Sequence, residues 1–406
     1  MNIWIFNQYA HPPDLPGGTR HYDLGRELVR RGYRVSIVAA SFHYQLHRET
    51  RLQPKDKWKI EDVDGIKFVW IRTAPYQRND WRRVRNMIEF TLRSYWLGRQ
   101  LPKLIGASPD VLIGSSVHLF TPLAAYWVAK RFRVPFVMEV RDLWPQTIVE
   151  VGKLSDSHPV IKLLRIIERF LYRKAQRIIV LGPQMVDYIA SQGVRRDKIV
   201  WIPNGVDLSR FEVPSVPSQK AKFNVMYLGA HGEVNALDTI VHAADIIQKK
   251  GHIEDIKFIL VGDGPEKPKL VDEAKKMGLT NIEFRDPVPK KDVPKVLSEA
   301  DVLIAIMEPK FYIYGGSLNK LSDYMAAAKP VICAVSSPYN PIERAQCGLT
   351  VKQDPLAIVD AVMKLYHMSQ GEREKLGLRG RRYAEKYHDI RKLAQRMEQV
   401  LLEVLN

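Results

Sequence analysis

Short apolar runs alternate with longer amphipathic stretches along most of the chain. Predicted strands cover residues 2–7, 34–40, 66–72, 111–115, 136–140 and 177–181, and predicted helices between them cover 20–31, 122–131 and 160–175. A second series of predicted strands covers 223–228, 257–261, 282–285, 302–306 and 331–334, with a helix over 237–248. Strands that alternate with helices are typical of βαβ units and parallel sheets. The pattern therefore predicts an α/β fold.

The chain of 406 residues is too long for one ordinary hydrophobic core. The two strand series are separated by a segment rich in proline and serine, which contains Pro214 and Pro217 and is typical of a linker. We expect two doubly wound domains, over residues 1–208 and 209–388, and a C-terminal helix over 389–406 that packs back on the first domain. Ligands of open α/β sheets bind beyond the carboxyl ends of the strands. Two such domains face to face would form a cleft.

The most informative stretch covers residues 315–332. A glycine-rich loop with Gly315 and Gly316 leads into a short helix that carries Lys320 near its start and Asp323 one turn later. Pro330 ends the helix and an apolar strand follows. A helix N-terminus with a nearby lysine favours an anion, and a carboxylate can accept two hydrogen bonds from a sugar diol. The stretch suits a nucleoside diphosphate, or it is an ordinary loop–helix–strand unit.

Other candidate residues also follow predicted strands. In the second half, one strand ends at Gly229, His231 and Gly232, and another at the sequence Gly-Asp-Gly-Pro over 262–265. Each motif alone is weak, but together with the 315–323 loop they indicate one nucleotide site. In the first half, Gly17 and Gly18 join the first strand to a helix, as a backbone anion contact or as a plain turn.

His118 follows the strand over 111–115, and Arg141 and Asp142 follow the next strand. These residues would lie at the same edge of the first sheet. We interpret His118 as a contact to a reacting sugar, against the alternative of a histidine at the core edge. Trp144, two residues after Asp142, is more often a core residue than a sugar platform.

The charge pattern adds a possible partner. The net charge is +17, which favours polyanions, anionic lipid or a phosphorylated substrate. Arginines alternate with tryptophans and other apolar residues over 78–99. A basic amphipathic helix with aromatic residues is typical of contact with an anionic membrane surface, or of an ordinary helix packed on its own domain.

Several classes of protein and site are disfavoured. Only two cysteines occur, Cys333 and Cys347, which argues against a disulfide framework and favours a reducing compartment. No apolar run is long enough to span a membrane, and residues 1–6 are typical of a first strand and not of a signal peptide. No cysteine-rich zinc motif is present, no Asp-x-Asp pair follows a predicted strand, and no Walker pattern occurs. We expect no metal ion and no other cofactor.

Four motifs together resemble glycosyltransferase family 4, whose members are retaining enzymes of the GT-B fold. In chain order the motifs are Gly-Gly at 17–18, Pro-Asn-Gly-Val-Asp at 203–207, Gly-Asp-Gly-Pro at 262–265 and Asn-Lys-Leu-Ser-Asp-Tyr-Met-Ala at 319–326. The resemblance covers nearly the whole chain. It looks closest to the bacterial branch that adds N-acetylated sugars such as N-acetylfucosamine to surface polysaccharides, and Arg-Asp-Leu-Trp-Pro at 141–145 supports that branch.

The resemblance implies two Rossmann-like domains facing a central cleft, and it assigns roles to residues. Asp323 would hold the ribose of the donor, Asn319 and Lys320 would meet the diphosphate, and His118 would contact the transferred sugar. Gly17 and Gly18 would close over the diphosphate. The further donor-binding candidates are Gly229, His231, Gly232, Arg285, Val288, Ser317 and Leu318, and possible substrate contacts are Arg141, Asp142 and Glu308.

The chain departs from the family pattern at two places. The first glutamate of the family motif that ends at Asp323 falls at Gly315, so the usual carboxylate to the donor sugar is missing there. The arginine and lysine that commonly grip the phosphates fall near Ala230–His231 and at Asn235. Lys320, helix N-termini or other basic residues must then meet the phosphate charge.

The resemblance implies a glycosyltransferase that moves a sugar from a UDP-sugar to a lipid-linked or glycan acceptor in capsule or O-antigen assembly. We expect it in the cytoplasm, peripheral on the inner face of the membrane, with no nucleic-acid partner. An epimerase of the same fold and a non-enzymatic polyanion-binding protein are the alternatives.

Overall fold

The computed structural model describes residues 1–78, 80–212, 222–251, 255–308 and 318–405. The chain divides into two units, which are described separately. The first unit contains Met1–Pro12, Gly18–Pro203 and Ile390–Asn406, and the second contains Pro13–Gly17 and Asn204–Asp389. The expected linker at Pro214 and Pro217, and the loop residues Gly315, Gly316 and Ser317, lie outside the described residues.

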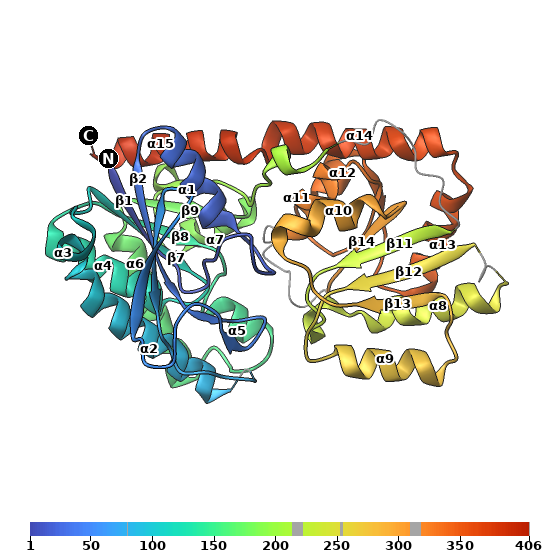
Figure 1. Cartoon of the computed structure of the whole chain (residues 1–406), viewed down its shortest axis with the longest axis horizontal. Helices are drawn as coiled ribbons and strands as arrows, with labels where there is room; N and C mark the ends of the chain where they lie inside the picture. The colour runs from blue at the N-terminus through green and yellow to red at the C-terminus, as the bar shows by residue number, and fades with distance from the viewer. Residues whose placement is uncertain (79, 213–221, 252–254, 309–317, 406) are drawn as a thin grey trace. The chain divides into compact units, whose positions relative to one another are not determined.

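The first unit is built on a sheet with the strand order β10-β9-β8-β7-β1-β2-β6-β5 (Figure 1). Its strands are β1 (Asn2–Phe6), β2 (Arg34–Ala40), β5 (Trp58–Val63), β6 (Ile66–Ile71), β7 (Val111–Ser116), β8 (Phe136–Val140), β9 (Arg177–Val180) and β10 (Ile199–Trp201), beside a small hairpin of β3 (Phe42–His43) and β4 (Arg48–Glu49). Its helices are α1 (Arg20–Arg30), α2 (Trp81–Gly98), α3 (Leu101–Ile105), α4 (Phe120–Phe132), α5 (Gln146–Glu150), α6 (Pro159–Lys174), α7 (Pro183–Ser191) and α15 (Ile390–Leu405). The predicted elements agree with these bounds to within two residues.

Helices cover both faces of this sheet, because the strands are apolar on both faces. On β1, Ile3 and Ile5 join a cluster with residues of α1 and of α15. The alternate residue Trp4 faces the other way and lies with its ring centroid 5.8 Å from that of Phe132 at the end of α4. The C-terminal helix α15 therefore completes the core of the first unit.

The edge strand β5 was not predicted, and it runs antiparallel to β6 in an otherwise parallel sheet. The two strands are joined by Asp64 and Gly65, which both have positive φ, 53° and 80°. Two central residues with positive φ are the mark of a tight type I′ hairpin turn, for which Asp-Gly is a preferred sequence. The dipeptide was a visible signal for this hairpin.

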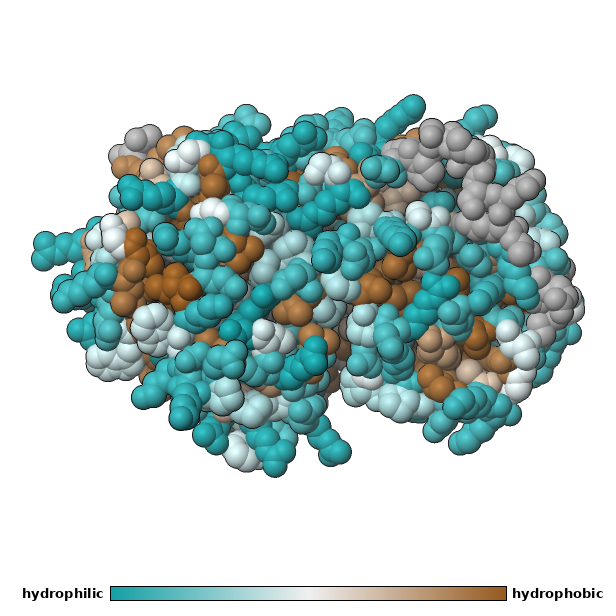
Figure 2. Space-filling view, in the orientation of Figure 1, coloured by the Kyte–Doolittle hydropathy of each residue, from teal (hydrophilic) through white to brown (hydrophobic). Residues whose placement is uncertain are grey.

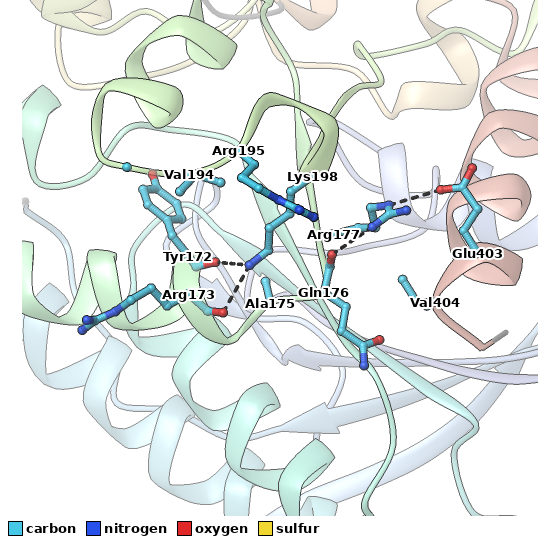
Figure 3. Close-up of a pocket in the computed structure, with 11 residues that line it drawn as sticks. Tyr172, Arg173, Ala175, Gln176, Arg177, Val194, Arg195, Lys198, Glu403 and Val404 are labelled. Carbon is cyan, nitrogen blue, oxygen red and sulfur yellow. Dashed lines mark hydrogen bonds and ion pairs between the residues drawn. The ribbon is translucent and has the colours of Figure 1, made fainter.

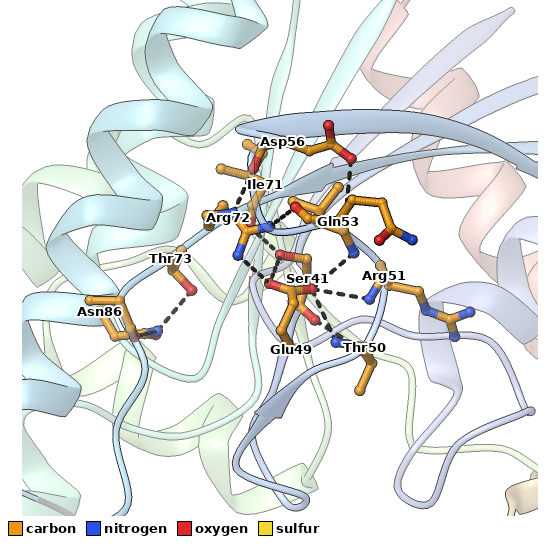
Figure 4. Close-up of polar contacts among 12 residues, drawn as sticks. Ser41, Glu49, Thr50, Arg51, Gln53, Asp56, Ile71, Arg72, Thr73 and Asn86 are labelled. Atoms are coloured by element: carbon orange, nitrogen blue, oxygen red, sulfur yellow. Dashed lines mark hydrogen bonds and ion pairs between the residues drawn. The ribbon is translucent and has the colours of Figure 1, made fainter.

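A polar cluster orders the chain after β4, next to the first sheet (Figure 4). The Oε1 atom of Glu49 accepts hydrogen bonds from the backbone N–H groups of Thr50, Arg51 and Leu52 at 3.0 to 3.1 Å. Its Oε2 atom accepts one from the Ser41 hydroxyl at 2.8 Å. A single carboxylate thus satisfies three consecutive backbone donors of this loop.

The second unit has a parallel sheet with the order β13-β12-β11-β14-β15-β16. Its strands are β11 (Phe223–Leu228), β12 (Ile256–Val261), β13 (Ile282–Arg285), β14 (Val302–Ile306), β15 (Val331–Ala334) and β16 (Gly348–Thr350). Its helices are α8 (Asp238–Lys249), α9 (Lys267–Lys276), α10 (Val293–Ser298), α11 (Asn319–Ala326), α12 (Pro341–Ala345), α13 (Pro355–His367) and α14 (Gln370–Tyr387). Residues of α8 and α13 pack on one face and residues of α10 and α11 on the other.

Candidate functional site

The candidate residues fall into two groups, one in each unit. Those in the second unit are Gly17, Gly229, His231, Gly232, Arg285, Val288, Glu308, Leu318, Asn319, Lys320 and Asp323. Those in the first unit are Gly18, His118, Arg141 and Asp142. Both groups follow the carboxyl ends of strands or begin the helices after them.

Lys320 lies in the first turn of α11, which follows the extended residue Leu318. Its ammonium group donates to the Tyr227 hydroxyl at 2.7 Å and lies 4.0 Å from the centroid of the same ring. The Tyr227 hydroxyl in turn donates to the backbone oxygen of Ala230 at 2.8 Å. Desolvation lowers the pKa of Lys320 to about 7. Among the described residues no carboxylate pairs with this ammonium group, so the cation has no counter-charge.

Backbone packing, and not open space for a ligand, explains the glycines of the two neighbouring strand-end loops. A Cβ atom at Gly262 would lie 1.9 Å from the backbone oxygen of Gly229, and one at Gly264 would lie 2.4 Å from that of His231. The loops are also joined by a hydrogen bond from the His231 backbone N–H to the Asp263 oxygen at 2.8 Å. At Gly229 a Cβ would meet the Lys320 ammonium at 2.8 Å. The absence of side chains therefore holds the loops together and leaves room for Lys320.

His231 is fully buried beside this cation. Within the described part of the chain neither of its ring nitrogens has a hydrogen-bond partner. Burial, with help from nearby Lys267, lowers the pKa of His231 to about 4, so the ring is neutral at physiological pH. An unpartnered buried imidazole retains one donor and one acceptor, which is unfavourable unless a ligand uses them. Gly232, the next residue, begins the 3₁₀ turn Glu233–Asn235.

Asp323 is buried on α11 and pairs through Oδ2 with the ammonium group of Lys290. Its Oδ1 atom is buried and has no partner among the described residues. The backbone N–H of Lys290 donates to the Leu15 oxygen at 3.2 Å, and that of Lys291 donates to the Pro13 oxygen at 3.1 Å. The turn that holds Asp323 therefore also holds the segment that leads to Gly17. Sequence reasoning missed Lys290, because no local pattern marks a pairing across 33 residues.

The remaining candidates of the second unit are placed less favourably for side-chain contacts. The Arg285 guanidinium is bound to Glu283 at 2.8 Å and to Glu299 at 2.6 Å, so Arg285 offers mainly its backbone. Val288 packs against the apolar cluster beneath α11. The Glu308 backbone N–H donates to the Val234 oxygen at 3.0 Å, which places Glu308 beside the loop after β11.

In the first unit, His118 follows β7 and is 1% exposed. The Phe120 backbone N–H donates to its Nδ1 at 3.3 Å, so its Nε2 carries the proton and donates to Gln8 Oε1 at 2.7 Å. Gln8 donates to Asn86, which donates to the Thr73 hydroxyl at 2.8 Å (Figure 4). Desolvation lowers the pKa of His118 to about 3. The imidazole is neutral and fixed, and a sugar contact through Nε2 would require Gln8 to move.

Arg141 and Asp142 follow β8, where the Arg141 backbone N–H donates to the Ser116 oxygen of β7 at 3.0 Å. Asp142 is exposed. The Trp144 ring lies 6.3 Å from that of His118, centroid to centroid. The structure thus brings the end of the Arg-Asp-Leu-Trp-Pro motif against His118 within one unit.

A buried ionic network near these residues was not predicted. Glu139 of β8 is 0% exposed and binds the Arg20 guanidinium at 2.8 Å and His21 Nε2 at 2.6 Å. It also accepts from the Ser115 hydroxyl at 2.7 Å. Burial alone would raise the pKa of Glu139, but Arg20 and His21 hold it well below its usual value. The network fixes the first turn of α1, directly after Gly18, and a glutamate inside an apolar strand was the signal for it.

Neither a metal site nor a membrane-spanning helix is found among the described residues. These residues contain no group of three or more histidine, cysteine or acidic side chains arranged to hold a metal ion. None of the helices in this part of the chain is both long and apolar enough to cross a membrane.

Comparisons with known proteins identify the family of the two domains. Residues 17–205 match the model of a glycosyl transferase 4-like domain, and residues 222–368 match that of glycosyl transferases group 1. The chain is 21% identical over 323 residues to WcaI of Escherichia coli (strain K12), described as a colanic acid biosynthesis glycosyl transferase, covering 76% of this chain and 77% of WcaI.

Solved structures show the same fold. Sucrose-phosphate synthase from Thermosynechococcus elongatus superposes with a TM-score of 0.76 at 17% identity, covering 99% of this chain and 98% of that one. HepE of Anabaena in complex with UDP-glucose superposes with a TM-score of 0.67 at 13% identity, covering 99% and 100%. The matches indicate a transferase and not the epimerase or polyanion-binding alternatives. The chain belongs to the glycosyltransferases of the GT-B fold, with a glycosyl transferase 4-like domain followed by a group 1 glycosyl transferase domain.

Proposed function

We propose that this glycosyltransferase moves a sugar from a UDP-sugar to a lipid-linked or glycan acceptor during assembly of a bacterial surface polysaccharide. The observation that carries the proposal is the Lys320 cation at the start of α11, which has no acidic partner among the described residues. It lies beside His231, whose ring nitrogens also have no hydrogen-bond partner there. The likeness to WcaI supports the polysaccharide role, and the UDP-glucose complex of HepE supports the donor class.

The donor site is built around α11. The diphosphate would contact Lys320 and the backbone N–H groups of Leu318 and Asn319 at the helix N-terminus. Asp323 Oδ1, which has no partner within the described part of the chain, would accept from the ribose, because a buried carboxylate oxygen without a partner is costly. The base would lie against the backbone of 285–288, and Gly17 and Gly18 would close over the diphosphate.

The chemistry requires no metal ion in this proposal. When the bond between the sugar and UDP breaks, negative charge develops on the leaving diphosphate, and Lys320 stabilises it as a preorganised donor. The acceptor hydroxyl attacks from the same face and gives its proton to the leaving phosphate, so the configuration is retained. His118, Arg141, Asp142 and Glu308 would contact the transferred sugar or the acceptor.

Turnover with and without an acceptor tests the function. Release of UDP from a UDP-sugar only when a glycan or lipid-linked acceptor is present supports a transferase, and acceptor-independent conversion of the sugar would contradict it. Two variants test the placement of the donor. Asp323→Ala should weaken UDP by about 1.5–3 kcal/mol, for one charge-assisted hydrogen bond. His118→Ala should leave UDP affinity nearly unchanged and lower kcat, and the reverse pattern would refute the placement.

The helices α2, α4 and α6 provide a surface that suits an anionic membrane. α2 packs on α4, and α4 on α6. Figure 2 shows hydrophobic side chains among hydrophilic ones over these helices. Trp96 and Trp127 are 57% and 42% exposed, and each lies under a cation, Arg99 at 5.0 Å and Lys130 at 5.1 Å. Exposed tryptophans next to basic side chains favour the interface of an anionic bilayer.

Liposome flotation tests this surface. Replacing both Trp96 and Trp127 with alanine should reduce recovery on anionic vesicles, whereas Arg379→Gln, an exposed change on α14, should not. Equal recovery of the native chain on neutral and anionic vesicles would contradict the electrostatic part of the proposal.

A further inference from the structure

A cavity of 520 Å³ opens at the amino edge of the sheet in the first unit (Figure 3). Its walls come from the end of α6, the start of β9, the loop before β10 and the last turn of α15. Arg177 is the first residue of β9, and Lys198 directly precedes β10. The residues proposed to contact the donor and the transferred sugar follow the carboxyl ends of strands. The cavity lies at the amino ends of β9 and β10, so it is separate from those residues.

The lining of the cavity is strongly basic. Its charged side chains are those of Arg173, Arg177, Arg195, Lys198 and Glu403. The single carboxylate is already used, because Glu403 pairs with Arg177 Nε at 3.2 Å. Lys198 donates to the backbone oxygens of Tyr172 and Arg173 at 2.7 and 3.2 Å. Its ammonium group has three donors, so one of them is left for a ligand.

Like charges meet in this cavity with little compensation. Burial lowers the pKa of Lys198, and the neighbouring charges of Arg195 and Arg177 lower it further. Arg195 has one carboxylate nearby, Asp197 at 3.2 Å, but both side chains of this pair are highly exposed, at 82% and 66%. Exposed ion pairs of this kind contribute little. A bound oxyanion would remove the repulsion among the three cations.

The size and polarity of the cavity define the class of ligand. Small-molecule sites typically have volumes of about 300–1,000 Å³. The volume of this cavity lies in that range and is larger than a single ion would fill. Guanidinium groups bind phosphate oxygens through paired hydrogen bonds, and a lysine adds a point charge. Most of the lining residues are polar or charged, which favours a polar molecule.

We propose that this cavity binds a small phosphorylated molecule, of the class of a sugar phosphate or a diphosphate, through Arg177, Arg195 and Lys198. The site is independent of the donor site and does not depend on the proposed function. Its place beside α15 lets a ligand bridge the C-terminal helix and the end of α6.

Calorimetry with pyrophosphate and glucose 1-phosphate, both with saturating UDP to fill the donor site, tests the proposal. At least one probe should still bind. Arg195→Gln should weaken that binding about tenfold or more without unfolding the chain, since the Arg195 side chain is 82% exposed. Arg196→Gln is the matched control, because Arg196 is equally basic and exposed but pairs with Asp187 and does not line the cavity.

Three results would overturn the proposal. UDP could abolish all binding of both probes, which would assign them to the donor site. Arg196→Gln could weaken binding as much as Arg195→Gln, which would indicate attraction to the general positive charge. Binding could occur only to vesicles that carry phosphatidic acid and to neither soluble probe, which would make the ligand a lipid headgroup. Lys198→Met provides a second variant and should weaken binding with Arg177 and Arg195 intact.

Discussion

Lys320 makes UDP binding depend on pH in a range where an ordinary lysine would not. Its pKa of about 7 means that half of the free protein carries the ammonium form at pH 7. Only that form attracts a diphosphate, and apparent affinity scales with the competent fraction. The affinity for UDP should therefore fall about fivefold from pH 7 to 8 and about tenfold from pH 8 to 9, near 1.4 kcal/mol per pH unit at the limit.

The sign follows from the direction of the shift. Burial lowers the pKa of Lys320, so the empty site loses its charge as the pH rises through 7, and a bound diphosphate restores it by raising that pKa. The phosphate groups of UDP are already ionised in this range, since a second phosphate pKa lies near ~6. The neighbouring His231, with a pKa of about 4, titrates below it, and Tyr227 and Tyr324 have pKa values raised by burial.

Titration calorimetry at pH 7, 8 and 9 in two buffers with different ionisation enthalpies measures both affinity and proton uptake. About 0.9 proton should be taken up per UDP at pH 8, as expected for a group with a free pKa one unit lower. Lys320→Met should bind UDP more weakly at pH 7, by about 1.5–3 kcal/mol, and should show no such dependence on pH. An affinity of the native protein that stays constant from pH 7 to 9 would refute the reasoning.

Three further substitutions test contacts that the structure places together. Lys290→Met should weaken UDP by about 1.5–3 kcal/mol because the carboxylate on α11 loses its partner, whereas Lys291→Met should have little effect in the same calorimetric titration. Glu139→Gln should lower the free energy of unfolding in urea by about 3–5 kcal/mol, since it leaves the buried Arg20 cation without its carboxylate; a loss below ~1 kcal/mol would contradict this. Gly262→Ala should destabilise by about 3 kcal/mol or more, because its Cβ would overlap a backbone oxygen, and Gly371→Ala, which has open space, should be neutral in the same urea titration.

Local patterns were sufficient for the architecture. Strands such as β1 and β11 were predicted from apolar runs of four to seven residues between amphipathic helices. Strands of a parallel sheet are buried on both faces, so their sequences are nearly continuous apolar runs. The sequence also predicts the helix start at Asn319 and the position of Lys320 within its first turn. Glycines before a helix and a proline after it are local signals for where the helix starts and stops. The antiparallel strand β5 was missed although its Asp-Gly turn was visible.

The contacts that define the site required the tertiary structure. Arg20 meets Glu139 across 119 positions, and Lys290 meets Asp323 across 33, and no periodicity relates residues so far apart. The same is true of Gly262, whose lack of a side chain is explained by the backbone of Gly229, which packs against it. The sequence by itself determined which side chains stand at the strand ends, because that depends on local spacing. Only the folded chain decided which of them are paired, buried or left with a free donor, because pairing and desolvation depend on neighbours that the strand order brings together.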